Sequence, residues 1–560
     1  MNLVLCKWGL CWRRGFYMFC KLRPITFLYR WLGIAVIFCI AGGCSPEHYK
    51  AEADKEVYKI IDGKWQDGFG QKVNYTVSDV PPSANDVQIK KTVPSSNAIS
   101  LAQAVAMATA HNRDYQLTKE SLYLSALGLT DTRHQYARQW FGTIDYRYTK
   151  EGGEEDVSVG GPGEGGENLV GFGHKQLLGD GLLVTTNLAI NWVRYLTGDP
   201  RTSLGSVLSA TVTAPILGAG AGKLAREQLT LAERKVLYDI RTFNRYRKTF
   251  VVGIVTAYYN VLQQRDVVTN AENNYKRSVE SKERLEMESE AGRKSRIDVD
   301  EAEQNVLTAE SRVVASQERY EQSLDAFKMS LSLPTDANVV LDQNELKALE
   351  EMGISEIDFT LDEAIETALL QRLDLYNSAD SIDDALRNVQ LAAEGLGPQL
   401  DLTGRTNEIK SPEGTDFSRL QFHRGTYDLF FDADLPLDRK TQRNEYRRAL
   451  IALEQQQRGY EEDMDSIKLA VRGAYRRLKE TADRYKIEKN SLKLAEERVE
   501  MNKVLLDAGR VTTRTLLLSQ DALLIAQNNV TKALIDHLDA KLSFYRDVGI
   551  MQVGPDGMWE

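Results

Sequence analysis

The fold is decided by two similar stretches, Ala291-Gly292-Arg293-Lys294-Ser295-Arg296-Ile297-Asp298 and Ala508-Gly509-Arg510-Val511-Thr512-Thr513-Arg514-Thr515. They lie 217 residues apart, and each places Ala-Gly-Arg at the end of a long segment with a helical pattern. Gly adopts the left-handed backbone geometry of a helix reversal without steric cost. The sequence therefore predicts two helical hairpins in one chain.

The segments before the two reversals have the pattern of coiled-coil helices. Residues 223–291 and 440–508 contain no proline, and apolar residues recur every three or four positions. Such a helix would run on the order of 100 Å at 1.5 Å per residue, several times the usual length. A shorter heptad helix is expected to return from each reversal, to Leu331 and to Val548.

The similarity extends into an internal repeat. The offset is 217 from residue 257 to residue 331, but Ser100-Leu101-Ala102-Gln103 and Thr360-Leu361-Asp362-Glu363 lie 260 apart, and Pro215 and Pro436 lie 221 apart. The first copy therefore holds about 39 extra residues before Pro215, in the segment near residues 150–200. We predict repeat 1 at residues 98–345 and repeat 2 at residues 346–549.

Alternating apolar and polar residues predict membrane strands within each repeat. They occur at residues 141–150, 208–214, 400–403 and 427–435. Four strands cannot close, because the smallest membrane barrels have about eight and an open edge in lipid leaves backbone groups unpaired. The barrel must be shared between copies. The inserted segment holds another alternating stretch, residues 184–192, and its sequence leaves open whether it enters the barrel.

The N-terminal part of the chain has the order of a secretory signal. Residues 1–43 contain six Lys or Arg, no acid and an apolar run, before Cys44 and Ser45. Small residues before a lone Cys resemble the lipobox of bacterial lipoproteins, which implies lipidation of Cys44 and, with Ser45 next, the outer membrane. A plain cleaved signal or short anchor is the alternative, and Met18 is a plausible start. Residues 44–97 are expected to form a tether, and residues 550–560 a tail.

Composition excludes several classes of function. Beyond the leader, 64 basic face 80 acidic residues, so a net charge near −16 argues against a nucleic-acid partner. All five cysteines lie within the first 44 residues, and the six histidines have no partner at metal-ligand spacing. Residues 218–223 lack the P-loop spacing, and Gly171 and Gly173 fit a strand better than a dinucleotide site. We expect no enzyme, metal or cofactor.

Several features together resemble the TolC-like outer-membrane efflux proteins: the paired helix starts, a proline expected to end the second strand of each copy (Pro215, Pro436), the Ala-Tyr pairs at 257–258 and 474–475, and the reversals. The resemblance implies a mainly helical fold with a membrane β-barrel, built as a homotrimer with about four strands per chain. It also implies a helical tunnel across the periplasm. A periplasmic adaptor would join the reversals to an inner-membrane pump.

The resemblance also implies functional positions. The adaptor-docking tips would be Gly292, Arg293, Ser295, Gly509, Arg510 and Thr512, although simple turn chemistry explains each one as well. The acidic residues that some members carry at the second tip are here Thr515 and Leu518. A pore constriction would then come from Asp298, Asp300 and Glu301, which a solvated helix start explains equally well.

The sequence features and the resemblance lead to two hypotheses about function. The first is a passive conduit of a tripartite efflux or type I secretion system in the outer membrane. The alternative is a trimeric coiled-coil lipoprotein that spaces the two membranes and transports nothing. The strands favour the conduit, because a spacer with a lipid anchor does not need them.

Overall fold

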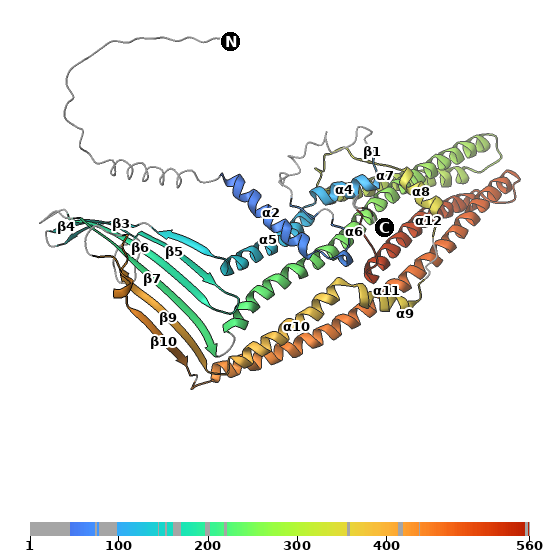
Figure 1. Cartoon of the computed structure of the whole chain (residues 1–560). Helices are drawn as coiled ribbons and strands as arrows, with labels where there is room; N and C mark the ends of the chain where they lie inside the picture. The colour runs from blue at the N-terminus through green and yellow to red at the C-terminus, as the bar shows by residue number, and fades with distance from the viewer. Residues whose placement is uncertain are drawn as a thin grey trace, which may run out of the picture. The chain divides into compact units, whose positions relative to one another are not determined.

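The computed structural model describes residues 45–72, 75–77, 98–143, 145–151, 154–160, 170–195, 202–217, 221–354, 359–412, 418–435, 437–554 and 558. The chain divides into two compact units, Met1–Tyr58 and Lys59–Glu560. Helix α2 (Pro46–Lys64) begins in the first, and the single-turn helix η1 (Asp67–Phe69) and all later elements belong to the second (Figure 1). The expected signal and Cys44 lie outside the described residues.

Two helical hairpins form the larger part of the second unit (Figure 1). The first joins α6 (Ala221–Glu290) to α7 (Arg296–Ser330), and the second joins α11 (Lys440–Asp507) to α12 (Thr513–Val548). The helices α6 and α11 have 70 and 68 residues, which confirms the predicted long helices. In each hairpin the two helices pack on each other, and α12 also packs on α6. A proline-free heptad pattern gives the continuous apolar stripe that this packing needs.

Each long hairpin is preceded by a pair of shorter helices. The first pair is α4 (Leu101–His111) and α5 (Arg113–Tyr136), and the second is α9 (Leu361–Gln371) and α10 (Leu373–Glu394). Ser100 and Thr360 start α4 and α9 with the same reciprocal capping box, to Gln103 and Glu363. The parallel strands β1 (Ala98–Ile99) and β8 (Val340–Leu341) pair beside α8 (Asn344–Met352).

Residues matched by the offset of 217 occupy similar core positions. Tyr258 is fully buried, its hydroxyl donates to the carbonyl of Ile99 at 2.9 Å, and its ring lies 5.9 Å from that of Phe327. In the second hairpin, the rings of Tyr475 and Phe544 lie 6.1 Å apart. Phe327 and Phe544 expose only 2% and 0% of their surface, so each hairpin closes on an equivalent aromatic pair.

Apart from β1 and β8, the strands of the described residues form one antiparallel sheet (Figure 1). They are β2 (Gln139–Thr143), β3 (Asp145–Glu151), β4 (Glu154–Gly160), β5 (Val170–Leu177), β6 (Leu183–Tyr195), β7 (Thr202–Leu217), β9 (Gln399–Lys410) and β10 (Tyr427–Asp434). The order is β10-β9-β7-β6-β4-β3, and β5 pairs with β2 and with β6. A short helix, η2 (Phe422–Arg424), lies between β9 and β10.

The predicted strand segments lie in this sheet. The sheet also shows whether the inserted segment of the first repeat pairs with the other strands. Residues 184–192 form part of β6, which pairs with β7 over most of its length, so the inserted segment belongs to this sheet. Gly171 and Gly173 lie in strand β5, as expected. Pro215 does not end its strand, because β7 continues to Leu217 after a register shift. A proline has no N–H for the ladder, which accounts for the irregularity. Pro436 lies outside the described residues.

Candidate functional site at the two helix reversals

The first reversal closes α6 with a left-handed glycine. Gly292 has φ of 72°, its N–H donates to the carbonyl of Ser289 at 2.9 Å, and the N–H of Arg293 donates to that of Glu288 at 2.8 Å. This pair of bonds satisfies carbonyls that the helix end leaves free. Ser295 then caps α7, because its hydroxyl accepts from the N–H of Asp298 at 3.2 Å.

The second reversal repeats this geometry. Gly509 has φ of 69°, its N–H donates to the carbonyl of Leu506 at 2.9 Å, and the N–H of Arg510 donates to that of Leu505 at 2.9 Å. Thr512 caps α12 by accepting from the N–H of Thr515 at 3.4 Å. The two reversals therefore have the same backbone hydrogen bonds. They differ in the residue three positions after the capping residue, which is Asp298 in the first and Thr515 in the second.

All six predicted docking residues lie at exposed positions of these reversals. Arg293 and Arg510 carry the charge, while the hydroxyls of Ser295 and Thr512 are engaged in capping their helices. Ser295 and Thr512 thus have a structural role of their own. Binding at these tips stays a prediction.

Two of the three acidic residues predicted at a constriction, Asp298 and Asp300, make local contacts. The carboxylate of Asp298 accepts from the N–H of Ser295 at 3.2 Å, which completes a capping box. Asp300 lies 3.5 Å from Arg296, and both side chains are largely exposed. Glu301 is exposed as well. These contacts fit a helix start, and a role in a pore stays a prediction.

Polar contacts also join the two hairpins near the reversals. Arg312 of α7 pairs with Asp521 of α12 at 2.6 Å. Deeper in the structure, Asp266 of α6 accepts from Thr531 of α12 at 2.8 Å. Burial raises the pKa of Asp266, although its hydrogen bonds from Thr531 and Asn270 act in the opposite direction. Sequence reasoning did not find these contacts, because the partners lie more than 200 residues apart.

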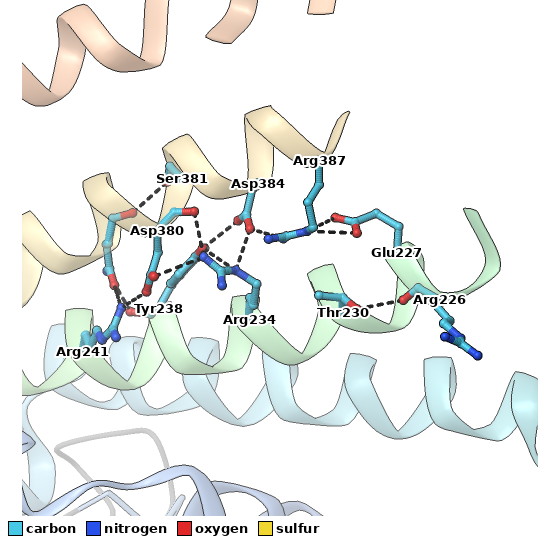
Figure 2. A network of polar contacts seen from close by, with 11 residues as sticks. Arg226, Glu227, Thr230, Arg234, Tyr238, Arg241, Asp380, Ser381, Asp384 and Arg387 are labelled. Atoms are coloured by element: carbon cyan, nitrogen blue, oxygen red, sulfur yellow. Dashed lines mark hydrogen bonds and ion pairs between the residues drawn. The ribbon is translucent and has the colours of Figure 1, made fainter. Parts of the chain in front are cut away.

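A network of charged residues joins α6 to α10 closer to the sheet, and we call it the α6–α10 ladder (Figure 2). It consists of Glu227, Arg234, Tyr238 and Arg241 on α6 with Asp380, Asp384 and Arg387 on α10. Arg387 donates to both carboxylate oxygens of Glu227 at 3.0 Å and also pairs with Asp384.

Asp384 is the centre of this ladder. It forms an ion pair with Arg234 at 2.6 Å and accepts a hydrogen bond from the hydroxyl of Tyr238 at 2.6 Å, and its side chain is 17% exposed. Burial, together with the hydrogen bond to Asp384, raises the pKa of Tyr238 to about 12. Arg241, with a side chain only 9% exposed, pairs with Asp380 at 2.5 Å. Partly buried pairs of this kind fix the relative position of the two helices.

A half-buried lysine, Lys248, lies between the first and second hairpins, further along α6 than the α6–α10 ladder. Lys248 of α6 donates to the carbonyl of Gly549, the residue that ends α12, at 3.0 Å. Burial, with the nearby charges of Arg247 and Arg245, lowers the pKa of Lys248 to about 8.

Within the described ranges, no group of three or more His, Cys, Asp and Glu residues could hold a metal ion. Among the same residues, no helix combines the length and apolar character that crossing a membrane requires.

Part of the chain matches a known protein family, and its fold matches solved structures. Residues 364–549 match the family model "Outer membrane efflux protein". No curated protein matches. Solved structures with the same fold include the CmeC channel of Campylobacter jejuni, at 15% identity and TM-score 0.58, covering 85% of this chain and 89% of that one.

Two further structures agree. VceC of Vibrio cholerae is 12% identical with a TM-score of 0.57, covering 80% of this chain and 96% of that one. MtrE of Neisseria gonorrhoeae, solved in an open state, is 12% identical with a TM-score of 0.56, covering 85% and 93%.

The fold is thus that of outer-membrane channels, and the matched family is one of channels, not enzymes. Residues 364–549 thus match the outer-membrane efflux protein family, and the fold is similar to that of solved outer-membrane channels, in agreement with the resemblance seen in the sequence.

Proposed function

We propose that the chain is the outer-membrane channel of a tripartite efflux or type I secretion system, a passive conduit across the outer membrane and periplasm. An inner-membrane pump would drive transport through a periplasmic adaptor. The chain would act as a homotrimer built from two repeats, with a tunnel of long helices below a shared β-barrel. No catalytic step is required of it.

The observation that carries this proposal is the sheet beside the long helices. On one face, β7 presents Leu208, Val212 and Ala214, and their partners on β9 include Ile409 and Leu402. A row of apolar side chains on one face of an antiparallel sheet suits lipid on that side and water on the other. The alternative, a spacer that transports nothing, gives such a sheet no role.

Conductance of the purified protein in planar lipid bilayers tests the proposal. A trimer that conducts ions supports the channel. A well-folded trimer that conducts no ions refutes the channel and favours the spacer.

Docking at the reversals is tested by charge reversal. We expect Arg510→Glu to abolish crosslinking to the periplasmic adaptor while the trimer stays intact, because the exposed Arg510 side chain makes part of the tip's charge. Arg458→Glu, on the exposed middle of α11, is the matched control. Unchanged crosslinking in Arg510→Glu would refute docking at this tip.

The proposed lipid anchor has a separate test. Cys44→Ala should remove lipid labelling and release the N-terminal tether from the membrane, and labelling that persists in this variant contradicts the assignment.

A further inference from the structure

We propose that the inserted hairpin of the first repeat is part of the barrel wall, so that each chain contributes six strand lines and the trimer encloses a wider pore for bulky cargo. A strand line here means the strands that occupy one row of the sheet: β2 and β3, which pair with β5 and β4; β4 and β5, which both pair with β6; then β6, β7, β9 and β10. Three copies of six lines make eighteen strands, against twelve for four lines. This inference rests on the proposed function as a trimeric channel.

The first support is the position of the insert within the sheet. Strand β5 pairs with β2 on one side and with β6 on the other, and β6 pairs with β7 from Leu183↔Thr213 to Arg194↔Thr202. The strands β2 and β7 are therefore separated by the inserted lines. An insert that left the sheet would have to break both ladders, and unpaired backbone groups in lipid cost several kcal/mol each.

The second support is the register of side chains. Val184 of β6 is opposite Val212 of β7, and Leu188 is opposite Leu208, so the apolar face of β7 continues onto the insert. The other face of β6 pairs Asn187 with Ser209. Because cross-strand partners point to the same side, the insert has one apolar and one polar face in phase with its neighbour. A membrane wall around water requires this alternation.

The third support lies at the turn between β5 and β6. The side chain of Arg226, near the start of α6, donates to the carbonyl of Gly179 at 2.9 Å and forms an ion pair with Asp180. A Cβ on Gly222 of α6 would meet the carbonyl oxygen of Asp180 at 3.1 Å. The turn therefore reaches the end of the sheet where the helices begin. The hairpin spans the full height of the sheet instead of extending one end of it.

The fourth support is the packing between β2 and β5. The rings of Trp140 and Phe172 stack with centroids 5.4 Å apart. On the opposite face the ring of Phe141 occupies the space above Gly173, where an added Cβ would lie 2.2 Å from it. An aromatic ring over a strand glycine pins the register of the pair. Strand β2, the first strand of the large sheet, thus packs against the insert as its neighbour.

The direction of the strands allows the barrel to close. Strand β2 leaves the helical end of the sheet after α5, and β10 returns to that end before α11. The two free edges of the sheet therefore run in opposite directions. The β10 edge of one copy can pair antiparallel with the β2–β3 edge of a second copy, which an even number of lines permits. The occupant of each edge is a second copy of this chain.

The number of strands sets the width. Barrel diameter grows roughly linearly with strand number, so eighteen strands give about one and a half times the diameter of twelve. Barrels of 16–18 strands leave an open aqueous channel. The part of the conduit that crosses the outer membrane would therefore pass large hydrated cargo, such as a polypeptide segment, without being its narrowest point.

Disulfide crosslinking in the intact trimer tests the arrangement. The chain has no cysteine after Cys44, so introduced pairs are the only thiols beyond it. We expect Trp140→Cys with His174→Cys, and Asn187→Cys with Ser209→Cys, to form disulfides in outer membranes, because each pair is directly opposite in the ladder. Opposed Cα atoms lie about 4.5–5.5 Å apart, within disulfide range.

The control pair is Asn187→Cys with Thr213→Cys, which the register places four residues, roughly 13 Å, apart. Disulfides in both matched pairs and none in the control support the six-line wall. A trimer that conducts ions but lacks the Trp140–His174 crosslink overturns this inference and leaves the channel standing. A trimer that does not conduct refutes the proposed function itself.

A polymer-exclusion measurement tests the width. Residues 152–201 are replaced by an Asn-Gly turn, which joins β3 to β7 as a direct hairpin. Polyethylene glycols are then added on the barrel side of a planar bilayer. We expect polymers that enter the full-length pore to be excluded from the shortened one. Equal exclusion in both proteins overturns the wider pore, and if the shortened chain does not assemble, the crosslinks in the full chain decide.

Discussion

The two halves of the chain agree at the reversals and differ at the sheet. At the reversals, Gly292 and Gly509 have φ values of 72° and 69° and the same pair of backbone bonds. At the sheet, among the residues that the structure describes, the first half supplies β2 to β7 and the second supplies β9 and β10. Antiparallel strands can be added in hairpin pairs without disturbing the ladder on either side, whereas a helix reversal has few backbone solutions. The number of strands in the sheet can therefore change while the helix reversals at the other end of the hairpins keep the same geometry.

The largest expected effect on the shared geometry of the two reversals comes from substituting Gly292 or Gly509. Gly509→Pro and Gly292→Pro should each disrupt their reversal by about 3 kcal/mol or more, because proline fixes φ near −65° and removes a hydrogen-bonded N–H. Hydrogen exchange at the ends of the flanking helices measures the loss. A proline at Gly459 cannot be the control, because Gly459 lies inside α11 and the change would disrupt that helix. The control is Gly509→Ala, which should lower the free energy of unfolding by roughly 1–2 kcal/mol. Equal exchange in Gly509→Pro and the unmodified protein contradicts the geometry.

The ladder tests how strongly the halves are joined. Asp384→Ala leaves Arg234, Arg387 and Tyr238 without the carboxylate that all three contact, so we expect a loss of about 1–3 kcal/mol in the free energy of unfolding. Thermal unfolding of the solubilised protein measures it. The control is Asp239→Ala, which breaks only an i,i+4 pair with the exposed Lys235 and should cost under about 0.5 kcal/mol. Similar losses in both variants would show that the ladder contributes little.

Lys248 gives the same interface a pH dependence. Its pKa is lowered from 10.5 to about 8 in the folded chain, so between these values the unfolded chain binds more protons. Stability should therefore rise with pH through this window, by on the order of 1–3 kcal/mol. We expect Lys248→Met to remove the rise in unfolding measurements at pH 8 and pH 10.5. Lys235→Met, at an exposed site, should keep it, and a slope unchanged in Lys248→Met argues against the assignment.

The smallest effect separates the two caps. Ser295 exchanges hydrogen bonds with Asp298 in both directions, whereas Thr512 meets Thr515 without an acidic partner. Ser295→Ala should cost about 1 kcal/mol and Thr512→Ala a few tenths less. The difference is read from unfolding midpoints at neutral pH. A cost for Thr512→Ala that equals or exceeds the cost for Ser295→Ala contradicts the expected order.

Much of the helical part was predictable from local signals. The absence of proline, the heptad spacing and the glycines fixed α6, α7, α11 and α12 to within a few residues. Ser100 and Thr360 gave the helix starts, because a capping box needs only residues three apart. The α6–α10 ladder was missed for the opposite reason. Glu227 and Arg387 lie 160 residues apart, and each resembles an ordinary charge on a solvated helix face.

The sequence by itself determined two helical hairpins, their reversals and the alternating segments that became strands. These features depend on propensity, periodicity and glycine geometry, which act over a few residues. Only the tertiary structure decided which strands are neighbours and that the insert lies between β2 and β7. Alternation assigns each strand two faces but names no partner, because strand pairing is a choice among distant segments that packing alone resolves.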